Sequence, residues 1–128
     1  DLSRINLTDD KDQIINKIKK AKTDSLPMPN NIDELEDRAE AKNLIGIYSS
    51  LSGSSLEKII NQFSGKNFSE FKENLSQVMV DKITPISNEI KKLLVDEDYL
   101  DKILIEGSKK ASDLASKKIK KIHEIIGF

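Results

Sequence analysis

The stretch NLIGIYSSLSGSSLEKIINQFSGKNFSEFK, residues 43–72, decides the fold because two glycine turns divide a continuous helical pattern. Its first part carries an apolar face at helical spacing, formed by Leu44, Ile47, Tyr48 and Leu51. Gly53 then stands where a residue in the left-handed conformation commonly ends a helix. Gly65, followed by Lys66, ends the next helical segment in the same way. The stretch therefore predicts three consecutive helices.

A helix start is predicted after each glycine turn. Ser54 and Glu57 have the spacing of a capping box, in which each side chain accepts a backbone N–H of the other end. Asn67 and Glu70 form a second candidate box. The two apolar faces that follow consist of Leu56, Ile59, Ile60 and Phe63, and of Phe68, Phe71 and Leu75.

The composition favours one all-α domain. The chain has 128 residues, with only three prolines and five glycines, and no convincing strand pattern. It has no cysteine, which excludes disulfides and thiolate chemistry, and its charged composition suits the cytoplasm. No apolar run approaches the roughly 20 residues that a membrane-spanning helix needs, so no membrane partner is expected. The net charge of −1 does not by itself indicate a polyanion as partner.

The N-terminal third divides into a basic helix and a connector. A first helix is predicted over residues 9–22, capped by Thr8 or Asp9 and ended before two prolines. The following residues are polar and acidic without a sustained period, so we expect a connector with a single helical turn near residues 32–35. The segments expected are therefore 1–25, which contains the first helix, 26–40 as connector, and 41–128 as a helical domain.

Two long helices complete the prediction. Apolar residues recur from Phe68 to Leu94 through Pro85, which predicts one helix with a kink near residues 81–84. A last helix should start at Asp96 or Asp98 and end at Gly127, and it carries small residues four apart at Gly107, Ala111 and Ala115. The fold class predicted is an antiparallel helical bundle of about four to five helices, with the long kinked penultimate helix packed on the C-terminal helix.

No residue pattern indicates a catalytic or metal site. His123 is the only histidine, and without cysteine it has no companions for a zinc site. Clustered acids such as Asp9 and Asp10 lie at helix starts, where capping and the helix dipole account for them. The sequence has no P-loop, dinucleotide fingerprint or serine nucleophile elbow. We therefore expect no catalytic residue, no metal and no cofactor in this chain.

Several ordered blocks of the sequence form a recognisable series. The N-terminal and central blocks are TDDK at 8–11, KIKKAKTDS at 17–25, NLIGIYS at 43–49, LSG at 51–53 and GKNFSEFK at 65–72. Further blocks lie in the C-terminal helices, at residues 85–86, 98–100, 106–111 and 126–128. In this order and spacing the blocks resemble bacterial tryptophanyl-tRNA synthetases, although the region 37–42, DRAEAK, departs from the Lys-Pro-Gly block of many relatives.

The resemblance implies a role in tRNA recognition. Members of this family are class I synthetases, in which a Rossmann-like domain uses ATP, with Mg, to activate tryptophan through a histidine-containing and a lysine-serine signature loop. Neither loop is present here. The chain is then expected to be the C-terminal helical part that recognises the anticodon, inactive alone. Its implied partners are tryptophan tRNA and the catalytic domain of the same protein, and the parent enzyme is a homodimer with tRNA lying across both subunits.

Charge and helix position indicate which lysines would contact phosphates. A lysine on a helix is usually solvated surface, but lysines arrayed along a phosphate backbone add affinity by releasing counterions. An alternative class is a free-standing helical protein-interaction module, whose binding would be insensitive to salt. The predicted tRNA-binding residues are Lys17, Lys20, Lys110, Lys117 and Lys121, with Lys66 and Lys72 as weaker candidates.

Overall fold

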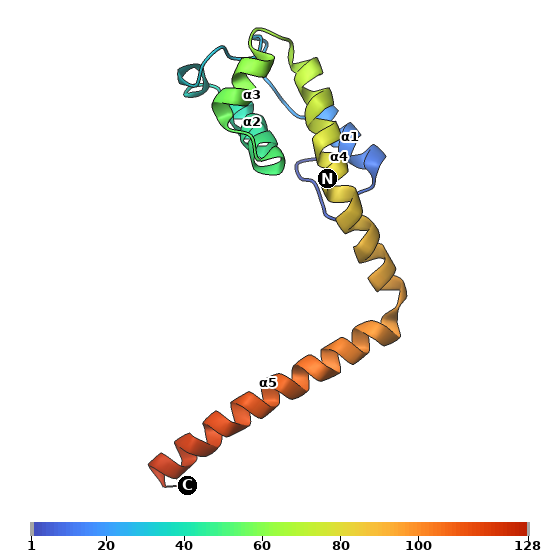
Figure 1. Ribbon diagram of the computed structural model, residues 1–128, viewed down its shortest axis with the longest axis vertical. Coiled ribbons are helices and arrows are strands. Elements are labelled where there is room, and N and C mark those ends of the chain that lie inside the picture. The colour runs from blue at the N-terminus through green and yellow to red at the C-terminus, as the bar shows by residue number, and fades with distance from the viewer. Residues whose placement is uncertain (1, 128) are drawn as a thin grey trace. The chain divides into compact units, whose positions relative to one another are not determined.

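The computed structural model describes residues 2–127. In that range its regular secondary structure is entirely helical, which confirms the all-α prediction (Figure 1). The chain divides into two compact units, Asp1–Glu89 and Ile90–Phe128, each of which is considered by itself. Residues 2–127 contain no strand. The elements are α1 (Lys11–Lys20), the 3₁₀ turn η1 (Asp33–Leu35), α2 (Ala39–Ser52), α3 (Leu56–Phe63), α4 (Phe68–Val95) and α5 (Glu97–Ile126).

Both predicted glycine turns are confirmed. Gly53 caps the end of α2 with a φ of 72°, and Gly65 follows α3 with a φ of 67°. These left-handed conformations cost a glycine little because it has no Cβ. The start of α4 is also as predicted, since the Asn67 side-chain oxygen accepts the Glu70 backbone N–H at 2.9 Å. The order of helix stops and starts read from residues 43–72 is therefore correct.

The start of α3 is one residue later than predicted. Ser55, rather than Ser54, is the N-cap and accepts the backbone N–H of Lys58 at 3.3 Å. Ser54 is instead part of the turn, because its carbonyl accepts the Ser49 hydroxyl at 2.6 Å and its N–H donates to Ser52 Oγ. With both backbone groups of Ser54 in use, the helix begins only after Ser55.

The first helix is shorter at both ends than the predicted range 9–22. Asp10 is its N-cap, in place of Thr8 or Asp9, and it forms a reciprocal capping box with Gln13 at 2.8 and 2.9 Å. Asp9 is unavailable as a cap because its carboxylate accepts the backbone N–H of Asn6 at 2.8 Å. A tight turn over residues 6–9 therefore precedes the helix.

The connector is more ordered than its sequence indicated. The predicted helical turn is confirmed as η1, and beyond it the Arg38 guanidinium donates two hydrogen bonds to Asp24, at 2.8 and 2.9 Å. The backbone of Met28 exchanges two hydrogen bonds with the Gly65–Lys66 turn, at 2.8 and 3.2 Å. Met28 is fully buried, which its proline-rich surroundings did not predict. The Met28 hydrogen bonds tie the connector to the turn between α3 and α4, and the Arg38–Asp24 pair holds the two ends of the connector together.

An aromatic cluster holds α2, α3 and α4 together. The ring centroids of Tyr48 and Phe63 lie 5.8 Å apart, those of Tyr48 and Phe71 5.7 Å, and those of Phe63 and Phe71 5.2 Å. The Tyr48–Phe63 and Phe63–Phe71 pairs meet edge to face, and the Tyr48–Phe71 rings are tilted by 30°. Aromatic pairs at such distances add about 0.5–1.5 kcal/mol each beyond the area they bury. Around the cluster pack the other fully buried side chains of the unit, including Ile14, Met28, Ile45, Ile59, Ile60 and Leu75.

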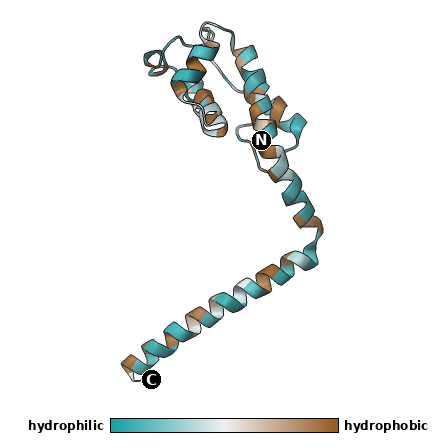
Figure 2. Cartoon of the chain, in the orientation of Figure 1, coloured by the Kyte–Doolittle hydropathy of each residue, from teal (hydrophilic) through white to brown (hydrophobic). Residues whose placement is uncertain are grey.

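The two C-terminal helices begin and end close to the predicted residues. Pro85 lies inside a continuous α4, as expected, and α5 starts after Asp96, whose carboxylate accepts the Tyr99 N–H at 3.1 Å. Gly127 ends α5 with a φ of 83°. Hydrophobic residues recur along α5 (Figure 2). The kink of α4, the packing of α5 on α4 and the three sequence segments stay predictions.

Two glycines of α2 provide a matched test of this assignment. At Gly53 an added Cβ strains the left-handed backbone, so Gly53→Ala should destabilise the chain by about 1–2 kcal/mol. Gly46 lies within the helix, and an added Cβ there meets no atom within 4 Å. Gly46→Ala should therefore stabilise the chain, by about 1 kcal/mol. Urea denaturation measures both; effects of equal sign would contradict the assignment.

Candidate nucleic-acid interface

Lys17 forms a nearly buried ion pair within the N-terminal unit. Its Nζ lies 2.6 Å from Asp9 Oδ2, and the two side chains are only 10% and 7% exposed. The same carboxylate accepts the Asn6 amide, so it holds the turn that precedes α1. Because an unpaired charge at such a site is costly, Lys17 is committed to Asp9.

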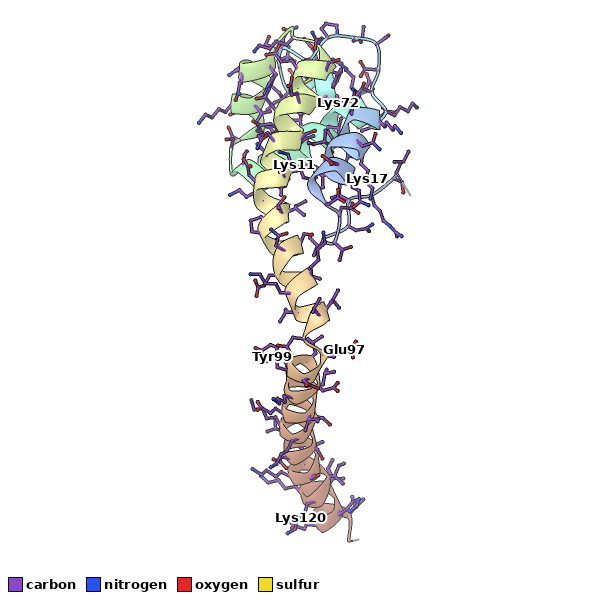
Figure 3. All side chains as sticks on the ribbon, turned by 90° about the vertical axis from the view of Figure 1, so that its right-hand side faces the viewer. Lys11, Lys17, Lys72, Glu97, Tyr99 and Lys120 are labelled. Atoms are coloured by element: carbon purple, nitrogen blue, oxygen red, sulfur yellow. The ribbon has the colours of Figure 1, made fainter. Side chains whose placement is uncertain are left out.

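Lys72 joins α4 to the end of α1 (Figure 3). Its Nζ donates a hydrogen bond to the carbonyl of Ala21, at 2.6 Å, and contacts Thr23 Oγ1 at 3.4 Å. Ala21 is the C-cap of α1, where the helix dipole places partial negative charge that a cation stabilises. Burial lowers the pKa of the Lys72 ammonium. The geometry gives Lys72 a structural contact between two helices.

Lys66 has an exposed and exchangeable partner. Its Nζ lies 2.7 Å from Glu70 Oε1 and 5.6 Å from the centroid of the Phe63 ring. The two charged side chains are 43% and 46% exposed, and surface pairs of this kind contribute only about 0–1 kcal/mol. A phosphate could therefore compete with Glu70 for this ammonium.

The four other predicted lysines are exposed and form no ion pair with another residue in the range 2–127. Lys20 is the last residue of α1. On α5, Lys110, Lys117 and Lys121 lie seven and four residues apart, so a helix of 3.6 residues per turn places them along one side. That side of α5 presents three cationic groups in a row about 16 Å long, at about 1.5 Å per residue.

A groove along the outer face of α2 was not foreseen from the sequence. It is a shallow, open depression of about 660 Å³ that lies entirely within the N-terminal unit. The signal for it was the run of small and polar residues at Asn43, Gly46 and Ser50, on the side of the helix away from its buried stripe. The groove is lined by Ala39, Lys42, Asn43, Gly46, Ile47, Ser50 and Leu51 of α2 and by Met79 of α4.

Among residues 2–127, histidine and acidic side chains form no group of three or more that could hold a metal ion. Within that range no helix has the length and apolarity to cross a membrane. His123, considered above as a lone histidine, is exposed near the end of α5.

All 128 residues of the chain align with curated tryptophan–tRNA ligases. The chain is 41% identical to the enzyme of Brucella melitensis, 44% to that of Rhizobium meliloti and 46% to that of Rickettsia felis. It spans about 36% of the length of the first two relatives and 38% of the third, and the match lies in their C-terminal portion. No protein-family model matches the chain.

The buried ion pair predicts a pH dependence of stability. The hydrogen bond from Lys17, followed by that from the Asn6 backbone, holds the pKa of the Asp9 carboxyl below its ordinary value of 3.8. A depressed pKa in the folded state stabilises the fold above the unfolded-state value, and this contribution is lost as pH falls through the folded-state value. Asp9→Asn should therefore be less stable than the parent at about pH 7, with a difference that shrinks below about pH 4.

Urea denaturation across this pH range measures the effect. Asp37→Asn is the matched control, since Asp37 is exposed and its carboxylate has no partner among residues 2–127. The assignment of the ion pair would be wrong if Asp9→Asn and Asp37→Asn changed stability equally at every pH.

Proposed function

Because the chain belongs over its whole length to the C-terminal portion of the tryptophan–tRNA ligase family, we propose that it is the helical part that binds the anticodon arm of tryptophan tRNA. The observation that carries this proposal is the identity of 41% to 46% across all 128 residues. The parent protein would ligate tryptophan to this tRNA with ATP, in the cytoplasm and as a homodimer. Its catalytic domain would be a further partner of this chain.

Binding and positioning form the mechanism that suits these helices. Phosphate contacts set the register of a nucleic acid, whereas unstacked loop bases are read by hydrogen bonds to their edges and by stacking. Lys110, Lys117 and Lys121 of α5 would supply one row of phosphate contacts. Lys20 would supply another phosphate contact. Lys66 would supply a further one once a phosphate displaces the Glu70 carboxylate from its ammonium group.

Lys17 and Lys72 are less accessible to a phosphate than the other predicted tRNA-binding lysines. Their ammonium groups are engaged by Asp9 and by the Ala21 carbonyl, so a phosphate would have to replace a short contact. We therefore assign them primarily to holding α1 in place. This leaves the exposed lysines to carry most of the salt-dependent affinity.

The residues of this chain do not fit the binding of ATP, Mg or tryptophan. The family's histidine-containing and lysine-serine signature loops are absent from the sequence, and no phosphate-binding glycine motif replaces them. No step of amino-acid activation is therefore assigned to this chain. A free-standing protein-interaction module, the alternative class, is disfavoured by the similarity of all 128 residues to the C-terminal portion of tryptophan–tRNA ligases.

Charge reversal on α5 tests the phosphate contacts. The triple variant Lys110→Glu, Lys117→Glu, Lys121→Glu should bind tryptophan tRNA far more weakly than the parent chain. Its plot of log affinity against log salt should also be shallower by about 2 to 3, since each phosphate contact contributes about 0.7–0.9 to the slope. Fluorescence anisotropy with labelled tRNA over a salt series measures both effects.

The matched control carries the same charge change elsewhere, at the exposed residues Lys58, Lys82 and Lys91. If both triple variants weakened tRNA binding equally, the cause would be general charge repulsion. The assignment of phosphate contacts to α5 would then be rejected. If the unsubstituted 128-residue chain bound tryptophan tRNA no better than other tRNAs, the proposed function itself would be rejected.

A second prediction concerns catalysis. We expect the 128-residue chain to support no pyrophosphate exchange that depends on ATP and tryptophan, because it lacks both signature loops. A full-length tryptophan–tRNA ligase in the same assay is the positive control. Exchange by the chain at a rate near that of the control would overturn the assignment of a binding role.

A further inference from the structure

The groove along α2 is open and has an apolar floor. Gly46 exposes backbone there, since an added Cβ would meet no atom within 4 Å, and Ile47, Leu51 and Met79 supply apolar surface. The Ser50 hydroxyl donates to the Gly46 carbonyl at 2.9 Å, so the polar groups of the floor already satisfy each other. A planar ligand could therefore lie on the floor without burying an unpaired donor or acceptor.

The rim of the groove offers two unused polar side chains. Lys42 and Asn43 are both exposed, and neither side chain forms a hydrogen bond or ion pair with another residue of the described range 2–127. The Asn43 amide provides donors and an acceptor, which is the pattern that pairs with a base edge. Lys42 is the one ionic group among the lining residues, and no carboxylate lines the groove.

We propose that this groove binds one unpaired nucleotide of the tRNA. The base lies on the floor formed by Gly46, Ile47 and Met79, the Asn43 amide hydrogen-bonds to the base edge, and Lys42 contacts the adjoining phosphate. This inference rests on the proposed function and adds to it a place where a loop base is read. A nucleotide uses the amide, the cation and the apolar floor together, whereas an apolar peptide would leave the amide and the cation without partners.

Gly46→Leu tests the proposal without disturbing the core. The new side chain extends into open space over the floor, and leucine favours a helix more than glycine does, so the variant should remain folded. Filling the floor should weaken binding of the anticodon stem-loop of tryptophan tRNA about tenfold, the size expected when a base loses one or two hydrogen bonds to a side-chain amide. Gln62→Leu is the control, since it adds the same side chain at an exposed position of α3 outside the groove.

A set of stem-loops that each lack one loop base identifies the bound nucleotide. Removal of the base that occupies the groove should weaken binding to the parent chain and have little further effect on Gly46→Leu. Asn43→Ala should weaken binding to the intact stem-loop less than Gly46→Leu does, and should show the same coupling to that base.

The outcomes separate this inference from the function beneath it. Tryptophan-tRNA binding that responds to the lysines of α5 but is unchanged in Gly46→Leu would overturn the groove site alone. The groove site would also be overturned if Gly46→Leu blocked a protein partner and left RNA binding intact. Absence of any preference for tryptophan tRNA in the parent chain would overturn both proposals.

Discussion

The contact on which the N-terminal unit depends is the aromatic cluster of Tyr48, Phe63 and Phe71, one residue from each of three helices. The ring centroids lie 5.2 to 5.8 Å apart, so each helix contacts both of the others through this cluster. The left-handed backbone of Gly53 and of Gly65 allows the chain to change direction within a few residues, so that the three rings come into contact. Since the cluster holds the inner face of α2, it also places the outer face, on which Gly46 and Asn43 lie.

The same residue type serves two purposes in this chain, and burial decides which. The side chains of Lys17 and Lys72 are partly buried, and their ammonium groups contact the Asp9 carboxylate and the Ala21 carbonyl in place of water. Lys110 and Lys117 stay exposed on α5 and keep their full capacity to attract a polyanion. A count of lysines along a helix therefore overestimates the surface available to RNA, whereas the exposed groups alone give the expected salt dependence.

The helix boundaries could be predicted because glycine turns and capping side chains act on residues close in sequence. Contacts between residues distant in sequence could not be predicted from the hydrophobic pattern. Gly53 and Asn67 act within a few residues, so their roles were visible in the sequence. The N-cap at Ser55 was missed because Ser54 is held by the turn, and the pairing of Lys72 with Ala21 was missed because it spans 51 residues of sequence. The groove at Gly46 was missed for a similar reason, since Met79, which completes its floor, comes from another helix.

NMR spectroscopy of the isotope-labelled chain with the anticodon stem-loop of tryptophan tRNA tests most directly whether this unit presents a base-binding groove. If it does, the signals of the Asn43 side-chain amide and the Gly46 backbone N–H should shift, and nuclear Overhauser contacts should connect the Gly46 α-protons to a single base. The signals of the buried ring of Phe71 should stay in place, because the unit that presents the groove is already formed. Shifts confined to residues away from α2, or no shifts with the stem-loop in excess at low salt, would contradict the account.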